Sequence, residues 1–242
     1  MAPPPLKNWR VLARKDLTHD VFELRLKRPN DASYKIEFRG GQYISIVIPG
    51  AGPGGRNLRR AYSIASAPEW DEVELCVKLV EGGPGTTYLN SLKIGDELQG
   101  QAPFGDFCLE HDQSLPALFI GTGTGLAPLR SMVLSTEWTA QGSIGFLLGV
   151  RAERDIIYPE LFGADRPTQL QGHEHVKIAL SRPEGHWSGF KGRVTDYMRQ
   201  MTWDFARSHY YLCGNGAMIA EVKKFLITKD VTKDQIHTEK YY

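Results

Sequence analysis

The chain has 242 residues, of which 41% are hydrophobic and 24% charged, and its formal net charge is +1. This composition is typical of a globular protein that can bury a core without disulfides or metals. A dedicated nucleic-acid-binding protein usually has a strong excess of basic residues, so the balanced charge argues against that class.

The cysteines and histidines exclude further classes. Cys76, Cys108 and Cys213 are far apart, which argues against a disulfide framework, a zinc ribbon or a protein-bound iron–sulfur cluster. His173 and His175 flank a single glutamate, which gives too few ligands for a metal site. The N-terminus lacks the apolar run of a secretory signal, and no stretch approaches the ~20 apolar residues that span a bilayer. We expect a cytoplasmic protein with no membrane span and no metal.

Residues 1–112 have the pattern of a β domain. Short runs rich in Val, Ile, Leu and Tyr, several with period-two alternation, are separated by turns rich in Gly, Pro and Asp. Six strands are expected, in residues 9–16, 20–28, 42–49, 59–66, 73–80 and 96–103. This spacing predicts a small antiparallel barrel, interrupted by one short helix at residues 86–92.

Residues 113–242 instead alternate between strands and helices. Short apolar strands are expected at 117–121, 144–150, 176–181 and 209–214, with helices at 125–138, 193–201 and 215–228. Strands that alternate with helices predict a parallel sheet with right-handed crossovers. The polar segment 110–116 is the expected boundary between the two domains.

Four motifs suggest ligand binding, each with a structural alternative. "GTGTGLAP" at 121–128 follows a strand and opens a helix, which suits phosphate binding but also a plain tight turn. "RRAYSIAS" at 59–66 places Arg60 and Tyr62 on one strand face, where they suit a phosphate and a planar ring, although many strands carry such residues. "EGGPGTTYL" at 81–89 is a phosphate nest or a capped turn. "YLCGNGAM" at 211–218 ends a sheet strand where ligands bind, or holds a buried structural cysteine.

These motifs occur in a defined order along the chain: "RAYS", "GGPGTTYL", "APFGDF", "GTGTGLAP" and "CGNGAM", with the ending "HTEKYY". In this order the sequence resembles the ferredoxin–NADP reductase family, and most of all the bacterial ferredoxin (flavodoxin)–NADP reductases. The resemblance covers roughly residues 9–242. It implies a six-stranded antiparallel FAD-binding barrel followed by a five-stranded parallel NADP-binding domain, with the C-terminal tail returning to the flavin.

The resemblance also implies residue roles. Ser63 is expected near flavin N5, Cys213 beside the nicotinamide, and Glu239 in proton transfer, so these three are the catalytic candidates. The residues expected to contact FAD are Arg60, Ala61, Tyr62, Ser63, Val77, Lys78, Leu79, Gly85, Thr86, Tyr241 and Tyr242. The residues expected around the nicotinamide nucleotide are Gly123, Thr124, Gly125, Cys213 and Gly214. A terminal tyrosine that covers the nicotinamide position has to move before transfer.

Arginines near the ends of the second-domain strands bear on the choice between NADP and NAD. The 2′-phosphate of NADP is usually held by arginine. The chain resembles the NADP-using bacterial reductases at Arg151, Arg182 and Arg193, and Ser181 precedes Arg182. Three guanidinium groups that converge repel one another unless an anion screens them, whereas each one alone is an ordinary solvated arginine. We expect NADP(H).

The predicted function is FAD-dependent electron transfer between NADPH and a separate one-electron carrier, ferredoxin or flavodoxin, by hydride transfer at flavin N5. Such carriers are acidic, so the basic residues Arg56, Arg59, Lys223 and Lys224 are candidate contacts. The protein is expected to be a monomer. The alternatives are an NAD(P)H-dependent oxygenase reductase component, a free-flavin reductase, and a non-catalytic flavin-binding relay subunit of a larger complex.

Overall fold

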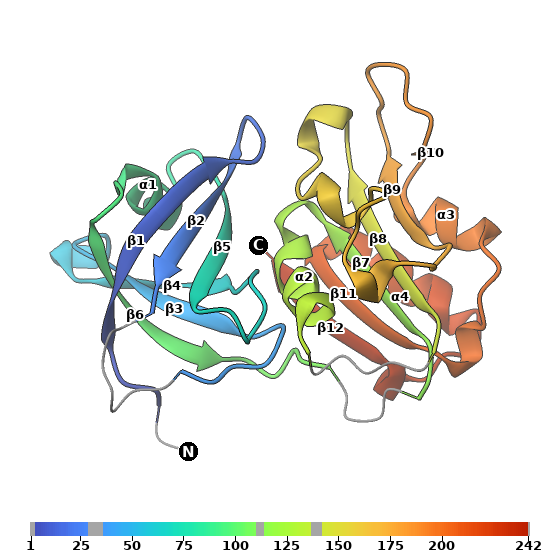
Figure 1. The fold of residues 1–242 in the computed structure, drawn as a ribbon, viewed down its shortest axis with the longest axis horizontal. Helices are drawn as coiled ribbons and strands as arrows, with labels where there is room; N and C mark the ends of the chain where they lie inside the picture. The colour runs from blue at the N-terminus through green and yellow to red at the C-terminus, as the bar shows by residue number, and fades with distance from the viewer. Residues whose placement is uncertain (1–2, 29–35, 110–113, 137–141, 242) are drawn as a thin grey trace.

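The computed structural model describes residues 3–28, 36–109, 114–136 and 142–241, and its two halves differ in architecture (Figure 1). The first half is a six-stranded antiparallel sheet in the order β4-β3-β6-β1-β2-β5. Its elements are β1 (Lys7–Asp16), β2 (Val21–Lys27), β3 (Tyr43–Ile48), β4 (Leu58–Ser63), β5 (Glu72–Lys78), α1 (Pro84–Ser91) and β6 (Glu97–Phe104). A bridge between Ile64 and Leu75 joins the two ends of the sheet, which therefore curls into a barrel. All six expected strands and the short helix are confirmed.

Alternating side chains fill the interior of the barrel. Leu24, Ile46 and Leu75 are fully buried with Trp9, whose Nε1 donates to Gly100 O at 3.3 Å. The neighbours of Trp9 on β1 are exposed, as period-two burial requires, whereas on β2 and β5 the outward-facing Glu23, Glu74 and Cys76 are buried as well, at the side that packs against the second half.

The second half is a parallel sheet in the order β10-β9-β8-β7-β11-β12, with helices on both faces. Its strands are β7 (Ala117–Thr122), β8 (Ile144–Val150), β9 (Val176–Leu180), β10 (Phe190–Lys191), β11 (His209–Asn215) and β12 (Ile236–Tyr241). Its helices are α2 (Leu126–Leu134), α3 (Val194–Gln200) and α4 (Gly216–Ile227). Helix α2 packs on one face with Phe119 and Phe146, while α3 and α4 pack on the other with Ile120 and Leu147.

This sheet has six strands, so the prediction of five was wrong. The last strand, β12, reads IHTEKY and contains no apolar run, which is why the sequence pattern did not mark it. It pairs with β11 over its whole length and satisfies the backbone groups along that edge. At the opposite edge, β10 has only two residues.

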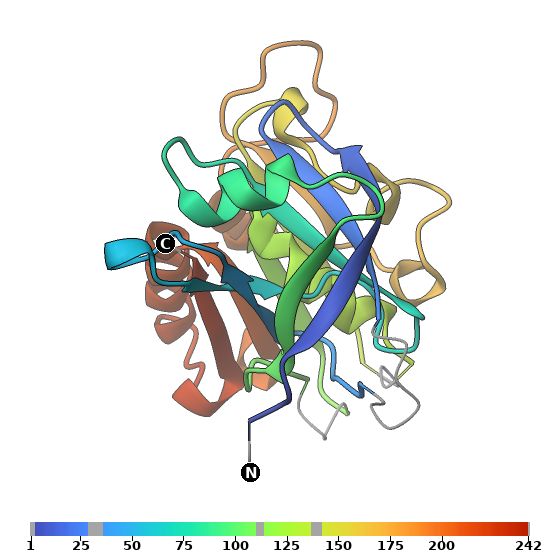
Figure 2. The same ribbon diagram turned by 90° about the vertical axis from the view of Figure 1, so that its left-hand side faces the viewer.

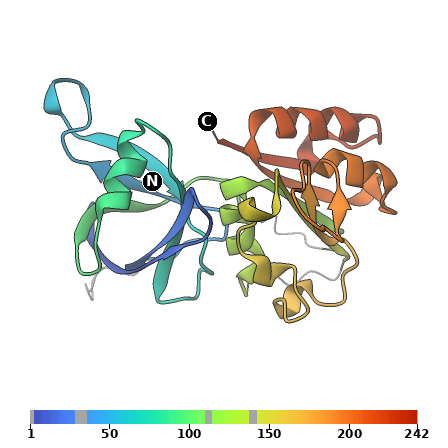
Figure 3. The same ribbon diagram turned by 90° about the horizontal axis from the view of Figure 1, so that it is seen from above.

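The two halves share an apolar junction. One continuous cluster joins Val21, Ala65 and Cys76 of the barrel to Leu129 and Met132 of α2. Seen from above, the halves lie side by side, and α2 and the C-terminal strand face the barrel (Figure 3). The elements that carry the glycine loop and the chain end therefore meet the barrel directly.

Candidate active site

Strand β4 presents the arginine and the tyrosine of its motif on one face. Arg60 and Tyr62 are two residues apart in an extended strand, so their side chains point the same way. Arg60 and Ala61 are exposed, while Tyr62 is half-buried, and burial raises the pKa of its hydroxyl to about 12. The neutral ring of Tyr62 and the cationic side chain of Arg60 therefore lie side by side on β4, the first strand in the order of this sheet.

Helix α1 begins beside this face, and a glycine permits the close approach. Gly83 caps the helix, Pro84 starts it, and Gly85 lies buried against β4. A Cβ atom at Gly85 would lie 2.5 Å from Tyr62 Oη and 3.0 Å from Arg60 Cγ. The guanidinium and the helix N-terminus both attract anions. This cradle fits the pyrophosphate of a flavin dinucleotide.

Other residues expected at the flavin already have protein partners. Thr86 Oγ1 bonds to the backbone of the loop that precedes α1. Lys78 Nζ pairs with Asp20 Oδ2 at 2.8 Å, and Leu79 N donates to Asp20 O at 2.7 Å. Val77 is buried. The side-chain hydrogen-bonding groups of Thr86 and Lys78 are thus already engaged within the protein.

The glycine loop between β7 and α2 lies against the end of β11. A Cβ atom at Gly125 would lie 2.4 Å from Cys213 O. Gly214 has a φ of +128° and would place a Cβ 2.3 Å from Thr122 Oγ1. The two motifs thus form one surface at the carboxyl ends of adjacent parallel strands, where open α/β sheets bind ligands. The half-buried residues at the tip of this loop are Gly123 and Thr124.

A hydrogen-bonded chain joins the barrel to the C-terminal strand. Tyr241 Oη donates to Ser63 Oγ at 2.6 Å, and Ser63 Oγ donates to Glu239 Oε1 at 2.8 Å. Cys213 stands opposite Glu239 in the β11–β12 ladder and is buried. Figure 2 shows the chain end beside the barrel. The three predicted catalytic residues are therefore brought together, and Tyr241 bonds directly to one of them.

Burial controls the acid–base properties of this group. It raises the pKa of Glu239, an effect that the hydrogen bond from Ser63 partly offsets. It also raises the pKa of Cys213 and of Tyr241, both of which the Glu239 carboxylate raises further. The thiol and the phenol stay neutral, and Glu239 is the group suited to exchange a proton. Tyr242, also expected at the flavin, lies outside the described residues.

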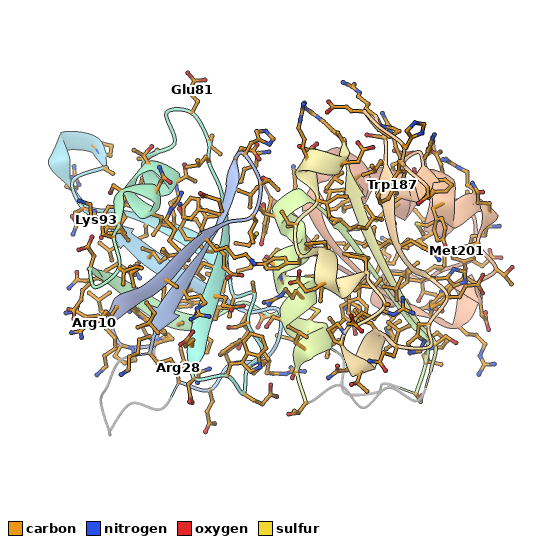
Figure 4. The ribbon with its side chains drawn as sticks, turned by 45° about the horizontal axis from the view of Figure 1, so that its top comes forward. Arg10, Arg28, Glu81, Lys93, Trp187 and Met201 are labelled. Atoms are coloured by element: carbon orange, nitrogen blue, oxygen red, sulfur yellow. The ribbon has the colours of Figure 1, made fainter. Side chains whose placement is uncertain are left out.

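The predicted phosphate arginines line one pocket of about 400 Å³, formed by Arg151, Ser181, Arg182, Gly192, Arg193 and Asp196. Arg182 N donates to Arg151 O at 2.7 Å, which ties the two arginine-bearing segments together. Arg193 Nη1 pairs with Glu221 Oε2 at 3.3 Å, and Asp196 Oδ2 accepts from Arg193 N. Within the described residues, no carboxylate lies within ion-pair distance of Arg151 or Arg182. Trp187 marks the loop that follows Arg182 (Figure 4).

The histidines thought too few for a metal site have other roles. His175 lies between Tyr197 Oη and Thr202 O, each at 3.0 Å, and His173 Nδ1 accepts from Ile144 N at 3.2 Å. In the described ranges, no group of three or more metal-ligating side chains comes together. No helix of the described chain is long and apolar enough to cross a membrane.

Sequence reasoning missed two features of the site. The first is the hydroxyl contact between Tyr241 and Ser63, because the roles expected for a terminal tyrosine, stacking on FAD and covering the nicotinamide position, involve its ring and not its hydroxyl. The second is Arg130, which α2 buries between the two halves beside Glu74. One signal for it exists in the sequence: Arg130 is the one charged residue of the helix segment LAPLRSMVL, whose other residues are apolar apart from Ser131.

Two family models match the chain, one over the barrel half and the other over the parallel-sheet half. Residues 8–108 match the oxidoreductase FAD-binding domain, and residues 119–224 match the oxidoreductase NAD-binding domain. The chain is 34% identical over 243 residues to ferredoxin–NADP reductase B of Sorangium cellulosum, covering 96% of each chain. It is 30% identical to the reductase component of propane 2-monooxygenase of Mycolicibacterium goodii, covering 98% of this chain and 68% of that protein.

Solved structures agree at the level of the fold. A cytochrome P450 reductase of Amycolatopsis matches with a TM-score of 0.82 and 27% identity, over 99% of this chain and 71% of that one. A ferredoxin–NADP⁺ reductase of Neisseria gonorrhoeae, solved with bound FAD and NADP, matches with a TM-score of 0.79 and 19% identity, over 98% and 99% of the two chains. An FAD-binding barrel, a nicotinamide-nucleotide domain and full-length similarity thus coincide, and the chain belongs to the ferredoxin–NADP reductase family of oxidoreductases.

Proposed function

We propose that this protein uses bound FAD to move electrons between NADPH and a separate one-electron carrier, ferredoxin or flavodoxin. The observation that carries the proposal is the Tyr241–Ser63–Glu239 chain, which joins the flavin strand to the nucleotide domain. The relative from Sorangium cellulosum, similar over 96% of both chains, supports the same assignment.

When bound, FAD would supply the chemistry that links two-electron hydride exchange with the nicotinamide to one-electron exchange with the carrier. The protein would supply position and protons. Arg60 and the start of α1 would hold the pyrophosphate, and Tyr62 would stack on the flavin ring. Gly125 and Gly214 would let the nicotinamide lie close to the backbone beside Cys213. Ser63 would hold a proton between Glu239 and the flavin edge.

The arginine pocket supports NADPH over NADH. Arg151 and Arg182 are exposed and lack a carboxylate partner among the described residues, so a phosphate is their natural counter-ion. The test is to mix the FAD-loaded protein anaerobically with NADPH or NADH and follow the flavin absorbance. Fast bleaching by NADPH and slow bleaching by NADH are expected. Equal rates would remove the arginine assignment, and a protein that does not bind FAD would remove the proposal.

The carrier would dock on a basic surface beside the flavin. Arg56 and Arg59 are exposed near the outer end of β4, and Lys224 is exposed on α4. Lys223 Nζ approaches Thr238 Oγ1 at 3.4 Å, next to the chain end. Electron transfer to an acidic ferredoxin or flavodoxin should slow as the salt concentration rises, because salt screens this attraction. A rate that does not depend on salt would argue against this surface.

A second function is favoured by a specific similarity. The propane 2-monooxygenase reductase component of Mycolicibacterium goodii is 30% identical to this chain. Under this alternative, the chain would pass electrons from NAD(P)H to an oxygenase. Reduction of an added oxygenase system at a higher rate than ferredoxin or flavodoxin would support it. A free-flavin reductase would release its FAD, and a non-catalytic relay subunit would show no turnover alone.

A further inference from the structure

Helix α2 carries a buried arginine at the junction of the two halves. Arg130 is 7% exposed, and its neighbours Leu129, Met132 and Val133 belong to the apolar cluster that both halves share. Burial of a guanidinium is unfavourable unless it is paired and hydrogen-bonded. A buried ion pair often contributes less stability than apolar side chains of the same volume. The contacts of Arg130 therefore point to a role in orientation.

The guanidinium reaches into the barrel. Arg130 Nη1 donates to Ala65 O and to Glu74 Oε2, both at 2.7 Å. Ala65 N donates to Glu74 O at 2.8 Å, so the two acceptors belong to one hydrogen-bonded pair of segments. The next helix residue, Ser131, donates to Ser66 O at 2.6 Å. Two consecutive side chains of α2 thus donate hydrogen bonds to two consecutive backbone carbonyl groups of the barrel.

Aromatic rings enclose this contact. The Arg130 guanidinium lies 4.4 Å from the ring centre of Tyr158 and 5.5 Å from that of Trp70. Tyr158 is buried and has a φ of +49°, a left-handed conformation that is unusual for a bulky residue. Such a backbone persists where the surroundings demand it. Tyr158 thus keeps its ring over the Arg130 guanidinium while its backbone adopts an unfavourable conformation.

Two buried carboxyl groups lie close to Arg130 at the junction. Glu23 and Glu74 are both buried, and Arg130 is the cation paired with Glu74. Burial and the neighbouring Glu74 raise the pKa of Glu23. Arg130 and Lys15 oppose this rise, so the guanidinium interacts with both carboxyl groups.

These hydrogen bonds between α2 and the barrel connect the two segments that would hold the cofactors. Ala65 and Ser66 directly follow the β4 segment that contains Tyr62 and Ser63. Arg130 lies on the helix that starts at the glycine loop with Thr124. A displacement at Arg130 would change the separation between these two segments. Apolar packing alone is non-directional and would not fix that separation.

We infer that Arg130 is a positioning residue: its contacts with Glu74 and Ala65 set the distance between the flavin strand β4 and the nucleotide loop before α2. The expected effect on the rate of flavin reduction rests on the proposed function, whereas the contacts of Arg130 do not depend on it. The ligand-binding groups themselves do not include Arg130 or Glu74.

The test is the double variant R130M/E74Q, which leaves no unpaired charge at this contact. The matched control is R25M/E72Q, which removes an arginine–glutamate pair between β2 and β5, the strand that also carries Glu74; its two side chains are 3.1 Å apart but far more exposed. With saturating NADPH, the rate of flavin reduction should fall by about 10- to 100-fold in the double variant, since small misplacements have effects of this size. The dissociation constants for FAD and NADP⁺ should stay within about twofold, and R130K should restore part of the rate.

A second readout does not depend on turnover. Hydrogen–deuterium exchange without nicotinamide nucleotide should quicken at residues 63–66 and 123–126 in R130M/E74Q and not in the control. An unchanged reduction rate with unchanged exchange would overturn the inference, as would a rate loss matched by an equal loss of NADP⁺ affinity. If the wild-type flavin is reduced by neither NADPH nor NADH, the proposed function fails, and the exchange measurement still decides the role of Arg130. If the double variant does not fold, E74Q alone is measured in the same way.

Discussion

At the scale of single residues, the site depends on groups whose charge state is set by burial. Burial raises the pKa of Glu239 and the hydrogen bond from Ser63 offsets only part of that rise, so Glu239 holds its proton to a higher pH than an exposed glutamate. Cys213 and Tyr241 are kept neutral by the same surroundings. One ionisable group can thus exchange protons while its neighbours stay fixed, which suits directed proton transfer.

Replacement of Glu239 by Gln should lower the rate of flavin reduction by NADPH and change its dependence on pH. In the wild-type protein the rate should fall as the pH rises through the raised pKa of Glu239, because the protonated carboxyl is lost. The variant should be slower and lack that limb of the profile. Stopped-flow absorbance across a pH series measures both. The control is E97Q, since Glu97 pairs with Arg10 on the outer surface at 3.1 Å. A variant with the wild-type profile would refute the proton role.

Replacement of Arg182 by Ala should weaken NADPH and leave NADH unaffected. A hydrogen bond to a charged group contributes about 1.5–3 kcal/mol, so the KM for NADPH should rise about 10- to 100-fold. Steady-state kinetics with both nucleotides measure the split. The control is R154A, because Arg154 is a nearby exposed arginine that already pairs with Glu184 at 3.1 Å. An equal loss for both nucleotides would show that Arg182 does not contact the 2′-phosphate.

At the scale of elements, the flavin cradle depends on how closely α1 approaches β4. Gly85 makes that approach possible, since any larger side chain meets Tyr62 and Arg60. The helix begins at Pro84, whose fixed φ suits the first turn and directs the N-terminus at the strand. The cradle is therefore a property of two elements and not of either alone.

Replacement of Gly85 by Ala should weaken FAD binding by about tenfold or more, because the new methyl group must displace the arginine and tyrosine that face the ligand. Titration of the FAD-free protein, followed by flavin fluorescence, gives the dissociation constant. G163A is the control, since a Cβ atom at Gly163 would lie 4.0 Å from Pro159 O, its nearest neighbour among the described residues. FAD affinity equal to that of the control would show that the cradle does not hold the cofactor.

Most elements were predictable, and the reasons differ from one to another. The barrel strands alternate clearly, and β7 and β8 are continuous apolar runs, so local pattern was sufficient. β12 is polar and becomes a strand only because β11 offers an open edge. Ser63 and Glu239 are 176 positions apart, and local pattern does not reveal such a contact. The family resemblance suggested both as site residues. It did not indicate Arg130, whose partner Glu74 is 56 positions away.

At the scale of the whole molecule, the two halves behave as one packed body. The apolar cluster at the junction contains residues of both halves, and α2 is buried in it almost entirely. Loss of either half would expose this surface. The free-energy cost of separating them is therefore coupled to the unfolding of each.

Thermal unfolding of the FAD-free protein should be a single cooperative transition. The shared core makes neither half stable once the other has unfolded. Calorimetry checks this through the ratio of the van't Hoff enthalpy to the calorimetric enthalpy, which should be close to one. Two resolved transitions would show that the junction contributes little.

Replacement of Glu23 by Gln should remove a pH-dependent contribution to stability. Burial and Glu74 raise the pKa of Glu23 above its ordinary value of 4.5. The folded protein then binds this proton more tightly than the unfolded chain does, so the contribution is complete below pH 4.5 and is lost as the pH rises through the folded-state pKa. The stability of the wild type relative to E23Q should fall over that range. Denaturant unfolding at several pH values measures the difference, and a difference that does not vary with pH would contradict it.

The position of β12 in the sheet also affects how the protein is made. A ribosome that has just added Ser63 needs 176 further residues before it adds Glu239. At about 5–20 residues per second this takes roughly 10 to 35 s, long enough for the barrel strands to pair. The residues of the flavin cradle would therefore emerge long before Glu239 does. Translation that stops early would yield a fragment that lacks Glu239 and leaves the junction surface of the barrel uncovered, so the site and the shared core are completed together when β12 is added.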